Sequence, residues 1–113
     1  MKTAVGIDIG GTITKIGLVS EEGVCIKKTS FRTKEETTFS SYINKLVGSI
    51  NTITNDEKIL GIGIGAPNAS KSGTIETPAN LKWRGKLNLV KDLRKKLNYN
   101  IYLSNDANCA AVG

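Results

Sequence analysis

Five residues near the amino terminus have the types and spacing that phosphate chemistry needs. They are Asp8, Gly10, Gly11, Thr12 and Lys15. A carboxylate such as that of Asp8 suits Mg²⁺, a hard cation that prefers oxygen ligands and retains waters. The two glycines suit a tight turn with positive φ, and their N–H groups can approach a phosphate closely. Thr12 adds a hydroxyl donor and Lys15 a mobile positive charge. The pattern predicts a nucleotide-phosphate site, and the alternative is an ordinary glycine hairpin beside a surface lysine.

An apolar strand must deliver these groups to the site. Residues 3–9 alternate between large apolar and small side chains, and Asp8 falls on the small-residue face. That face leaves room for a ligand or a metal ion beside the carboxylate. Residues 13–20 form the return strand, residues 21–23 a turn, and residues 24–31 a third strand. The sequence therefore begins with an antiparallel meander.

The predicted fourth strand, residues 58–65, has three glycines on one face: Gly61, Gly63 and Gly65. Glycine costs conformational entropy within a strand, so we expect another group to approach closely there. For Gly61 and Gly63 we expect that group to be a helix. Gly65 lies at the carboxyl end of the strand, where open α/β sheets bind ligands, and we therefore expect it to contact substrate.

The loop at 66–84 contains both prolines and the polar residue Asn80. The amide of Asn80 suits the vicinal hydroxyls of a sugar, but its position alone favours a turn residue after Pro78. Trp83 is able to stack on a sugar ring. Because a lone tryptophan in such a loop is more often buried against its domain, we leave Trp83 out of the site.

Asp106 is the strongest catalytic candidate. It follows the apolar strand at 101–104 and precedes a run of small residues, where a parallel strand turns into a helix. A carboxylate in that place serves as a general base or as a helix N-cap, and position alone favours neither. The chain has no histidine, so a general base must be a carboxylate or, less easily, a lysine with a depressed pKa.

Helices alternate with the remaining strands. One apolar stripe at helical spacing predicts a helix with a single buried face, which Thr37, Thr38 or Ser40 would cap. The stripe consists of Phe39, Tyr42, Ile43, Leu46, Val47, Ile50 and Ile53. A second helix is predicted at residues 87–97, and a third begins after the strand at 101–104.

Four segments of the chain resemble the ROK family, which is named for repressors, open reading frames and sugar kinases. These segments are residues 8–15, 63–68, 77–83 and 105–111. Their order and spacing match over nearly the whole chain, and the glucokinase-like members are the most similar. The resemblance implies an α/β fold of the ribonuclease H-like (actin-like ATPase) type, in which a three-stranded meander precedes alternating helices and strands.

The resemblance also implies a function, the ATP-dependent phosphorylation of a hexose hydroxyl, with glucose to glucose 6-phosphate as the leading reaction. Asp106 would then be the catalytic base, and Asn105 would hold a neighbouring hydroxyl. The expected sugar-binding residues are Gly65, Asn80, Asn105 and Asp106, and the expected ATP-binding residues are Asp8, Gly10, Gly11, Thr12 and Lys15. Asp8 would also engage Mg²⁺, directly or through water.

Composition fits a soluble, cytoplasmic protein of one domain. The chain has 113 residues, of which 39% are hydrophobic and 23% charged. No apolar run approaches the roughly 20 residues of a membrane span, and one lysine precedes the first strand, so we expect neither a membrane partner nor a secretory signal. Cys25 and Cys109 are far apart in the sequence and are expected to be reduced.

The net charge of +6 has two interpretations, a basic cleft that attracts ATP or a solvated surface. Four basic residues cluster on the predicted second helix: Lys91, Arg94, Lys95 and Lys96. We interpret this cluster mainly as a polar helix face, because no aromatic residues are interleaved with it. We therefore do not expect a nucleic-acid partner.

The 113 residues lack the second domain that the resemblance implies. The adenosine pocket, the family's structural zinc site and the rest of the sugar site would lie in that carboxy-terminal lobe. We therefore expect residues 1–113 to be the amino-terminal lobe of a longer kinase, inactive alone, whose parent is a homo-oligomer. Two alternatives remain. A sugar-responsive ROK regulator usually has a helix-turn-helix region ahead of the phosphate motif, which here begins almost at Met1. A non-catalytic actin-like ATPase domain would not need Asn80, Asn105 and Asp106.

Overall fold

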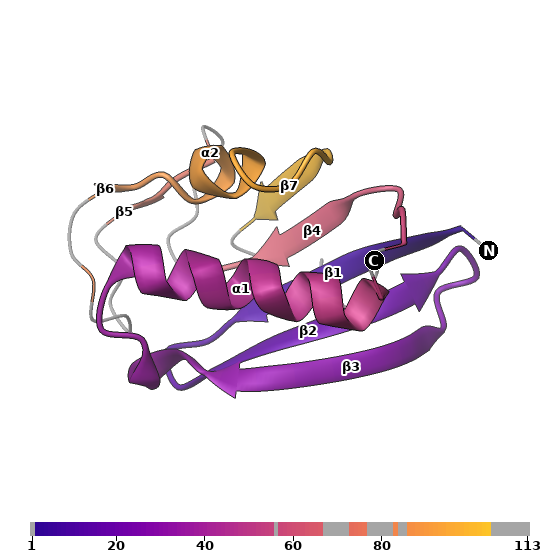
Figure 1. Ribbon diagram of the computed structural model, residues 1–113, viewed down its shortest axis with the longest axis horizontal. Helices are drawn as coiled ribbons and strands as arrows, with labels where there is room; N and C mark the ends of the chain where they lie inside the picture. The colour runs from indigo at the N-terminus through magenta and orange to yellow at the C-terminus, as the bar shows by residue number, and fades with distance from the viewer. Residues whose placement is uncertain (1, 56, 67–72, 77–82, 84–85, 105–113) are drawn as a thin grey trace.

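The computed structural model describes residues 2–55, 57–66, 73–76, 83 and 86–104 (Figure 1). The elements, in chain order, are β1 (Thr3–Ile9), β2 (Ile13–Ser20), β3 (Cys25–Arg32), the 3-10 helix η1 (Thr33–Glu35), α1 (Phe39–Thr54), β4 (Ile62–Gly65), β5 (Ile75–Glu76), β6 (Lys86–Leu87), α2 (Leu89–Arg94) and β7 (Ile101–Ser104). The predicted third helix lies outside the described residues.

Five strands form one mixed sheet in the order β3-β2-β1-β4-β7, with β1 in the centre. The first three strands pair antiparallel, which confirms the predicted meander. β4 pairs parallel with β1, and β7 pairs parallel with β4. Because these three strands run in the same direction, their carboxyl ends meet at one edge of the sheet (Figure 1). The predicted α/β architecture is therefore confirmed.

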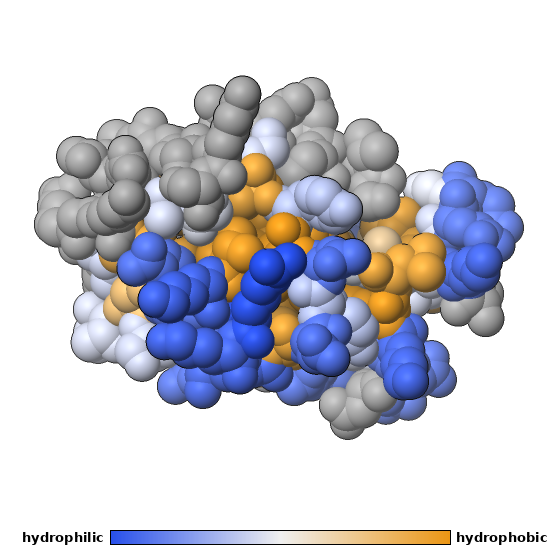
Figure 2. All heavy atoms as spheres, turned by 90° about the horizontal axis from the view of Figure 1, so that it is seen from above, coloured by the Kyte–Doolittle hydropathy of each residue, from blue (hydrophilic) through white to orange (hydrophobic). Residues whose placement is uncertain are grey.

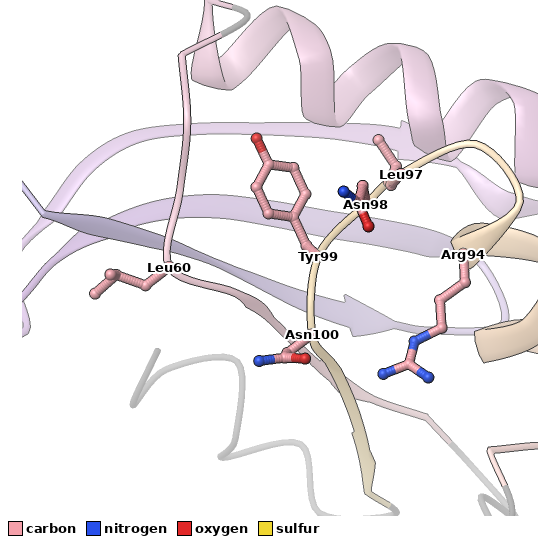
Figure 3. A pocket seen from close by; sticks show the side chains of 6 residues that line it. All are labelled: Leu60, Arg94, Leu97, Asn98, Tyr99 and Asn100. Atoms are coloured by element: carbon pink, nitrogen blue, oxygen red, sulfur yellow. The ribbon is translucent and has the colours of Figure 1, made fainter.

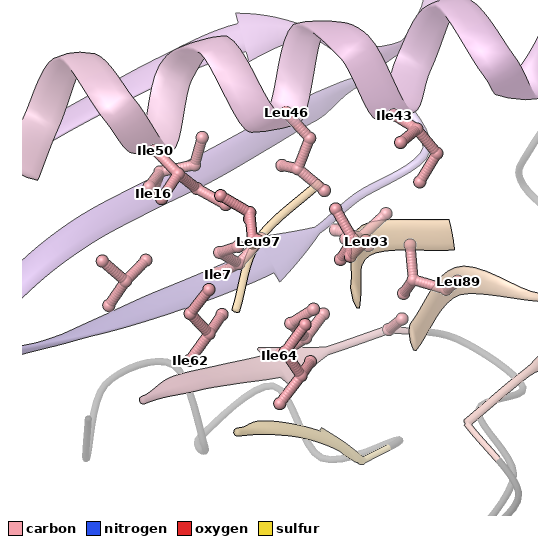
Figure 4. Packing of buried hydrophobic residues seen from close by; sticks show 14 of the residues in the cluster. Ile7, Ile16, Ile43, Leu46, Ile50, Ile62, Ile64, Leu89, Leu93 and Leu97 are labelled. Atoms are coloured by element: carbon pink, nitrogen blue, oxygen red, sulfur yellow. The ribbon is translucent and has the colours of Figure 1, made fainter. Parts of the chain in front are cut away.

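Helices α1 and α2 both pack on the same face of the sheet. The apolar stripe of α1, which includes Leu46 and Ile50, is buried against large side chains of the strands, as predicted. Figure 4 shows these α1 side chains pointing toward the sheet, with Leu93 of α2 beside them. The core therefore lies between one helical layer and one sheet. Because successive side chains of a strand point to opposite faces, the glycines that alternate with the large residues lie on the face away from the helices.

Local chemistry sets the ends of α1. The side chain of Thr38 accepts a hydrogen bond of 3.0 Å from the N–H of Ser41, so Thr38 is the N-cap, one of the three residues predicted for that role. The helix ends at Asn55, whose φ of 55° places it in the left-handed region that asparagine tolerates better than most residues. These two residues fix the length of the helix that packs across β2 and β3.

Two strands and several element boundaries differ from the sequence prediction. β4 begins at Ile62 instead of residue 58, and α2 ends at Arg94 instead of residue 97. Residues 75–76 and 86–87 form a small antiparallel sheet, β5–β6, in what was predicted to be an irregular loop and the start of a helix. Leu87 pairs with Ile75, so α2 begins at Leu89 instead of residue 87. Two-residue strands have no periodicity, and a long-range pairing of this kind leaves no local signal in the sequence.

The expectation that a helix packs closely against Gly61 is wrong, whereas the same expectation for Gly63 stays a prediction. Gly63 lies opposite Gly6 of β1 and alternates with Ile62 and Ile64, which face the described helices. A Cβ at Gly61 would lie 3.2 Å from the carbonyl oxygen of Asn100, so the close neighbour there is backbone that leads into β7. A strand glycine signals close approach but does not identify the element that approaches.

The described surface is mixed in polarity. Hydrophobic residues reach it between hydrophilic groups on the side of α2 and β7 (Figure 2). β3, at one edge of the sheet, is exposed over most of its length and includes Lys27 and Lys28. Cys25, at its start, is a free and exposed thiol. Within the described ranges, the helices are too short or too polar to cross a membrane.

The core predicts a contrast between two leucines. Leu46 is fully buried on α1, whereas Leu60 is 60% exposed just before β4. We expect Leu46→Ala to lower the free energy of unfolding by about 2–5 kcal/mol, because truncation removes apolar contacts and leaves a cavity. Leu60→Ala is the matched control and should change it by no more than about 0.5 kcal/mol. Urea unfolding of both variants measures this, and equal losses would contradict the assigned core.

Candidate functional site

A three-residue turn, residues 10–12, joins β1 to β2 and is called here the glycine turn. The N–H of Gly10 donates to the carbonyl oxygen of Ile13 at 3.0 Å and closes the turn. The N–H of Thr33, the first residue of η1, donates to the carbonyl oxygen of Thr12 at 2.9 Å. The glycine turn is therefore held both by its own hairpin and by the segment that follows β3.

The glycine turn does not use positive φ, contrary to the sequence prediction. In the described part of the chain, the glycines with positive φ are Gly23 and Gly73. Gly10 is needed for a different reason, because a Cβ there would lie 2.7 Å from the carbonyl oxygen of Ile13. Any side chain at Gly10 would force the backbone of the turn to move. The motif therefore identifies Gly10 correctly as a position that needs glycine. The reason is the close approach of the Ile13 backbone and not a positive φ.

The strand register places Lys15, Asp8 and Gly65 in one row across the sheet. Asp8 lies directly opposite Lys15 of β2 on one side and Gly65 of β4 on the other. Gly65 in turn pairs with Ser104 of β7. Direct cross-strand partners share a face, so this row lies on the face opposite α1 and α2. Asp8 is partly buried, Lys15 is exposed and Gly65 is buried.

This row lies next to the glycine turn. Ile9 ends β1 and Gly10 follows, while Gly65 and Ser104 end the neighbouring parallel strands. The structure therefore brings together six of the predicted residues at the end of the sheet where β1 and β4 finish: Asp8, Gly10, Gly11, Thr12, Lys15 and Gly65. The other three, Asn80, Asn105 and Asp106, lie outside the described residues.

The Asp8 carboxylate is available for a cation. Among the described residues it has no hydrogen-bond or ion-pair partner. That same part of the chain has no group of three or more acidic or cysteine side chains that would hold a metal ion. A cation at Asp8 would take most of its ligands from water and from phosphate oxygens, which is the coordination that Mg²⁺ favours in nucleotide sites.

Three buried hydroxyls lie behind the glycine turn, and sequence reasoning missed them as a group. The hydroxyl oxygen of Thr14 is 2.7 Å from that of Thr33 and 2.7 Å from that of Tyr42. Burial raises the pKa of the Tyr42 phenol, and the hydrogen bond with Thr14 lowers it by less, so the phenol stays neutral and keeps its proton. The available signal was Thr14, a polar residue on the apolar face of β2.

Trp83 is buried, as expected, and packs beside these hydroxyls. Its indole N–H donates to the carbonyl oxygen of Glu36 at 3.2 Å. The ring centroids of Trp83 and Tyr42 are 4.6 Å apart, and those of Trp83 and Phe39 are 5.6 Å apart. These contacts tie the segment around residue 83 to the start of α1.

A pocket of about 410 Å³ lies at the opposite edge of the sheet from the glycine turn. Leu60 and Asn100, which precede β4 and β7, line it together with Arg94 and Tyr99. Figure 3 shows that the side chains of Arg94, Asn100 and Leu60 diverge and do not converge on one point. This arrangement does not form a second candidate site.

The chain is similar to known proteins over nearly its whole length. A sequence profile of the ROK family matches residues 4–113. A glucokinase of Thermotoga maritima is 30% identical over 111 residues, which are 96% of this chain and 35% of the relative. An N-acetyl-D-glucosamine kinase of Photobacterium profundum is 29% identical over 110 residues, 95% of this chain and 36% of the relative.

Solved structures share the fold. A ROK family glucokinase from Streptomyces griseus, in complex with glucose and AMPPNP, superposes with a TM-score of 0.81 and 25% identity, over 94% of this chain and 34% of that one. The chain thus spans about a third of the length of the proteins it matches. Its sheet and helices have the actin-like ATPase fold of ROK sugar kinases. With the profile match over residues 4–113, this shows that the chain belongs to the ROK family.

Proposed function

We propose that this chain is the amino-terminal lobe of an ATP-dependent kinase that phosphorylates a hexose hydroxyl. The observation that carries the proposal is the row of Lys15, Asp8 and Gly65 beside the glycine turn, at one edge of the sheet. The relatives with glucokinase and N-acetyl-D-glucosamine kinase activity support a sugar as the phosphate acceptor. Glucose is the first substrate to test, because proteins named as glucokinases are similar to this chain over nearly its whole length.

The nucleotide phosphates belong at the glycine turn in this proposal. The backbone N–H groups of the turn and the Thr12 hydroxyl donate to phosphate oxygens, and the Lys15 ammonium balances their charge. Asp8 holds Mg²⁺ directly or through water, and the ion supplies charge neutralisation at the phosphates when it is bound. The exposed Lys15 and the carboxylate of Asp8, unpartnered in the described part, are both free to serve a ligand.

The sugar belongs beside Gly65, where a side chain is absent from the strand end. Asn80, Asn105 and Asp106 orient its hydroxyl groups, and Asp106 accepts the proton of the attacking primary hydroxyl. As the oxygen–phosphorus bond forms in line, the bond between the γ-phosphorus and the bridging oxygen breaks and ADP leaves. Positioning and electrostatic stabilisation supply most of the rate in this kind of reaction.

The remainder of the active site belongs to a second lobe in this proposal. That lobe supplies the adenosine pocket, and the structural zinc of the family would lie there. Residues 1–113 alone cannot close around two substrates and exclude water, so they should not turn over. We expect the parent protein to be a cytoplasmic homo-oligomer.

The first test is ADP formation by the full-length protein with ATP, Mg²⁺ and a panel of hexoses. Sugar-dependent ADP formation is expected, and the preferred sugar names the substrate. Residues 1–113 alone are the control and should form no ADP above background. A folded full-length protein without turnover on any hexose would contradict the proposal and favour a sugar-responsive regulator or a non-catalytic ATPase domain.

Removing the proposed base should separate chemistry from binding. In the full-length protein, Asp106→Asn keeps the size and shape of the side chain, but the amide cannot accept the hydroxyl proton. We expect turnover to fall at least ~100-fold while the sugar dissociation constant changes little. Steady-state kinetics and calorimetric titration of the sugar measure the two effects. Near-normal turnover would remove Asp106 from the role of base.

A methyl group in the glycine turn should disrupt nucleotide use. Because the Cβ of Gly10→Ala would lie 2.7 Å from a carbonyl oxygen, the turn must shift. We expect kcat/KM for ATP to fall about tenfold or more, since small displacements of positioning groups have large kinetic effects. Gly48→Ala is the matched control, because a Cβ there meets nothing within 4 Å. Similar kinetics for the two variants would show that the turn does not hold the phosphates.

A further inference from the structure

The three buried hydroxyls behind the glycine turn connect elements that are distant in sequence. Thr14 lies at the start of β2, Thr33 in η1 and Tyr42 in the first turns of α1. The exposed fractions of these side chains are 0%, 2% and 0%, and both hydroxyl contacts of Thr14 measure 2.7 Å. The three are called here the hydroxyl triad. No buried side-chain polar atom in the described part of the chain lacks a hydrogen-bond partner.

Thr33 links the hydroxyl triad to the glycine turn. Its hydroxyl bonds Thr14, two residues after the turn, and its N–H donates to the carbonyl oxygen of Thr12 within the turn. A displacement of the Thr33 backbone would therefore disturb both contacts together. The N–H and hydroxyl of Thr12 are proposed to bind a phosphate. Thr33 holds the backbone of Thr12 in place through its own N–H, without contacting that phosphate.

Tyr42 links the same triad to Trp83. The Tyr42 ring packs on Trp83 and on Phe31 at centroid distances of 4.6 and 5.5 Å. The indole N–H of Trp83 donates to Glu36, whose own N–H donates to the carbonyl oxygen of Thr33 at 3.2 Å. Tyr42 therefore cannot shift without moving either η1 or Trp83, and its hydroxyl is held in one place.

Hydrophobic burial does not explain the hydroxyl of Tyr42. A phenylalanine would fill the same ring position, whereas a buried hydroxyl must find partners to offset its loss of hydration. The net contribution of such a satisfied bond to stability is small. A fully satisfied buried network instead makes one arrangement of its elements unique. The arrangement that this network fixes is the junction of the glycine turn, η1 and α1.

We propose that Tyr42 is a positioning residue for nucleotide binding, which acts through Thr14 and Thr33 on the glycine turn. This inference rests on the proposed function, because it assigns the turn to the ATP phosphates. Tyr42 does not contact the nucleotide. It holds the backbone of the turn in the geometry that binds the phosphates. The turn therefore loses less conformational entropy when the nucleotide binds.

The test is Tyr42→Phe in the full-length protein, with the non-hydrolysable nucleotide AMPPNP and Mg²⁺ as the probe. Isothermal titration calorimetry should show the dissociation constant for AMPPNP rising about fivefold, the effect of one hydrogen bond. The KM for ATP should rise by a similar factor, whereas the KM for the sugar should change less than twofold. If Tyr42 were merely structural, its substitution would lower the melting temperature without raising the KM for ATP more than the KM for the sugar.

Two further variants sharpen the result. Thr33→Val removes a triad hydroxyl but keeps the N–H that bonds Thr12, and it should also raise the AMPPNP dissociation constant. Both changes act through Thr14, so their effects should not add. The dissociation constant of the double variant for AMPPNP should rise by less than the product of the two single-variant factors. Thr54→Val is the matched control, since the buried Thr54 hydroxyl donates to the Ile50 carbonyl at 2.9 Å in the last turn of α1. It should leave AMPPNP affinity unchanged.

The outcomes separate the two proposals. Wild-type protein that binds AMPPNP while folded Tyr42→Phe binds it equally well would overturn the positioning role and leave the kinase proposal intact. The same holds if Thr54→Val weakens binding as much as Tyr42→Phe does. A folded wild-type protein that does not bind AMPPNP would overturn the nucleotide role of the turn, and the positioning role with it.

Discussion

The structure depends on the pairing of β1 with both of its neighbours. β1 is the central strand, and its register with β2 and β4 places Val5 beside Leu18 and Ile62, and Ile7 beside Ile16 and Ile64. One face of the sheet thereby becomes a continuous apolar surface for α1 and α2. The other face receives glycines and the polar row that contains Asp8. A shift by one residue would send Asp8 into the core, so burial of Ile7 and Val5 fixes the site as firmly as it fixes the fold.

The fold could be predicted from the sequence wherever periodicity was long. The meander, the stripe of α1 and the strand before residue 105 are where the alternation of side chains placed them. Elements of two residues were missed, because β5 and β6 exist only through their mutual pairing. The glycines show a further limit. The sequence marks Gly10 and Gly61 as constrained positions, yet the groups that constrain them are the carbonyl oxygens of Ile13 and Asn100.

The sequence identifies residues that we propose to face the ligand, but it does not identify those that we propose to support them. Asp8, Lys15 and Gly65 have side chains, or an absence of one, that chemistry identifies directly, and the register then places them together. Thr14 and Tyr42 belong to different elements, and each alone is an ordinary residue of its strand or helix. Their relation depends on how α1 lies across β2, which no local pattern contains. Residues that position a site without contacting its ligand are therefore the hardest to identify from sequence.

The exposed edge strand β3 has a consequence for the behaviour of this chain in solution. An edge strand of eight residues offers unpaired N–H and C=O groups to any strand that arrives in the right orientation. The two adjacent lysines, Lys27 and Lys28, stand in the middle of that edge. A second copy that paired along β3 would bring these like charges together across the new ladder, which is destabilising. Charge on the rim of the sheet therefore discourages the growth of ordered aggregates from a surface that backbone hydrogen bonding alone would favour.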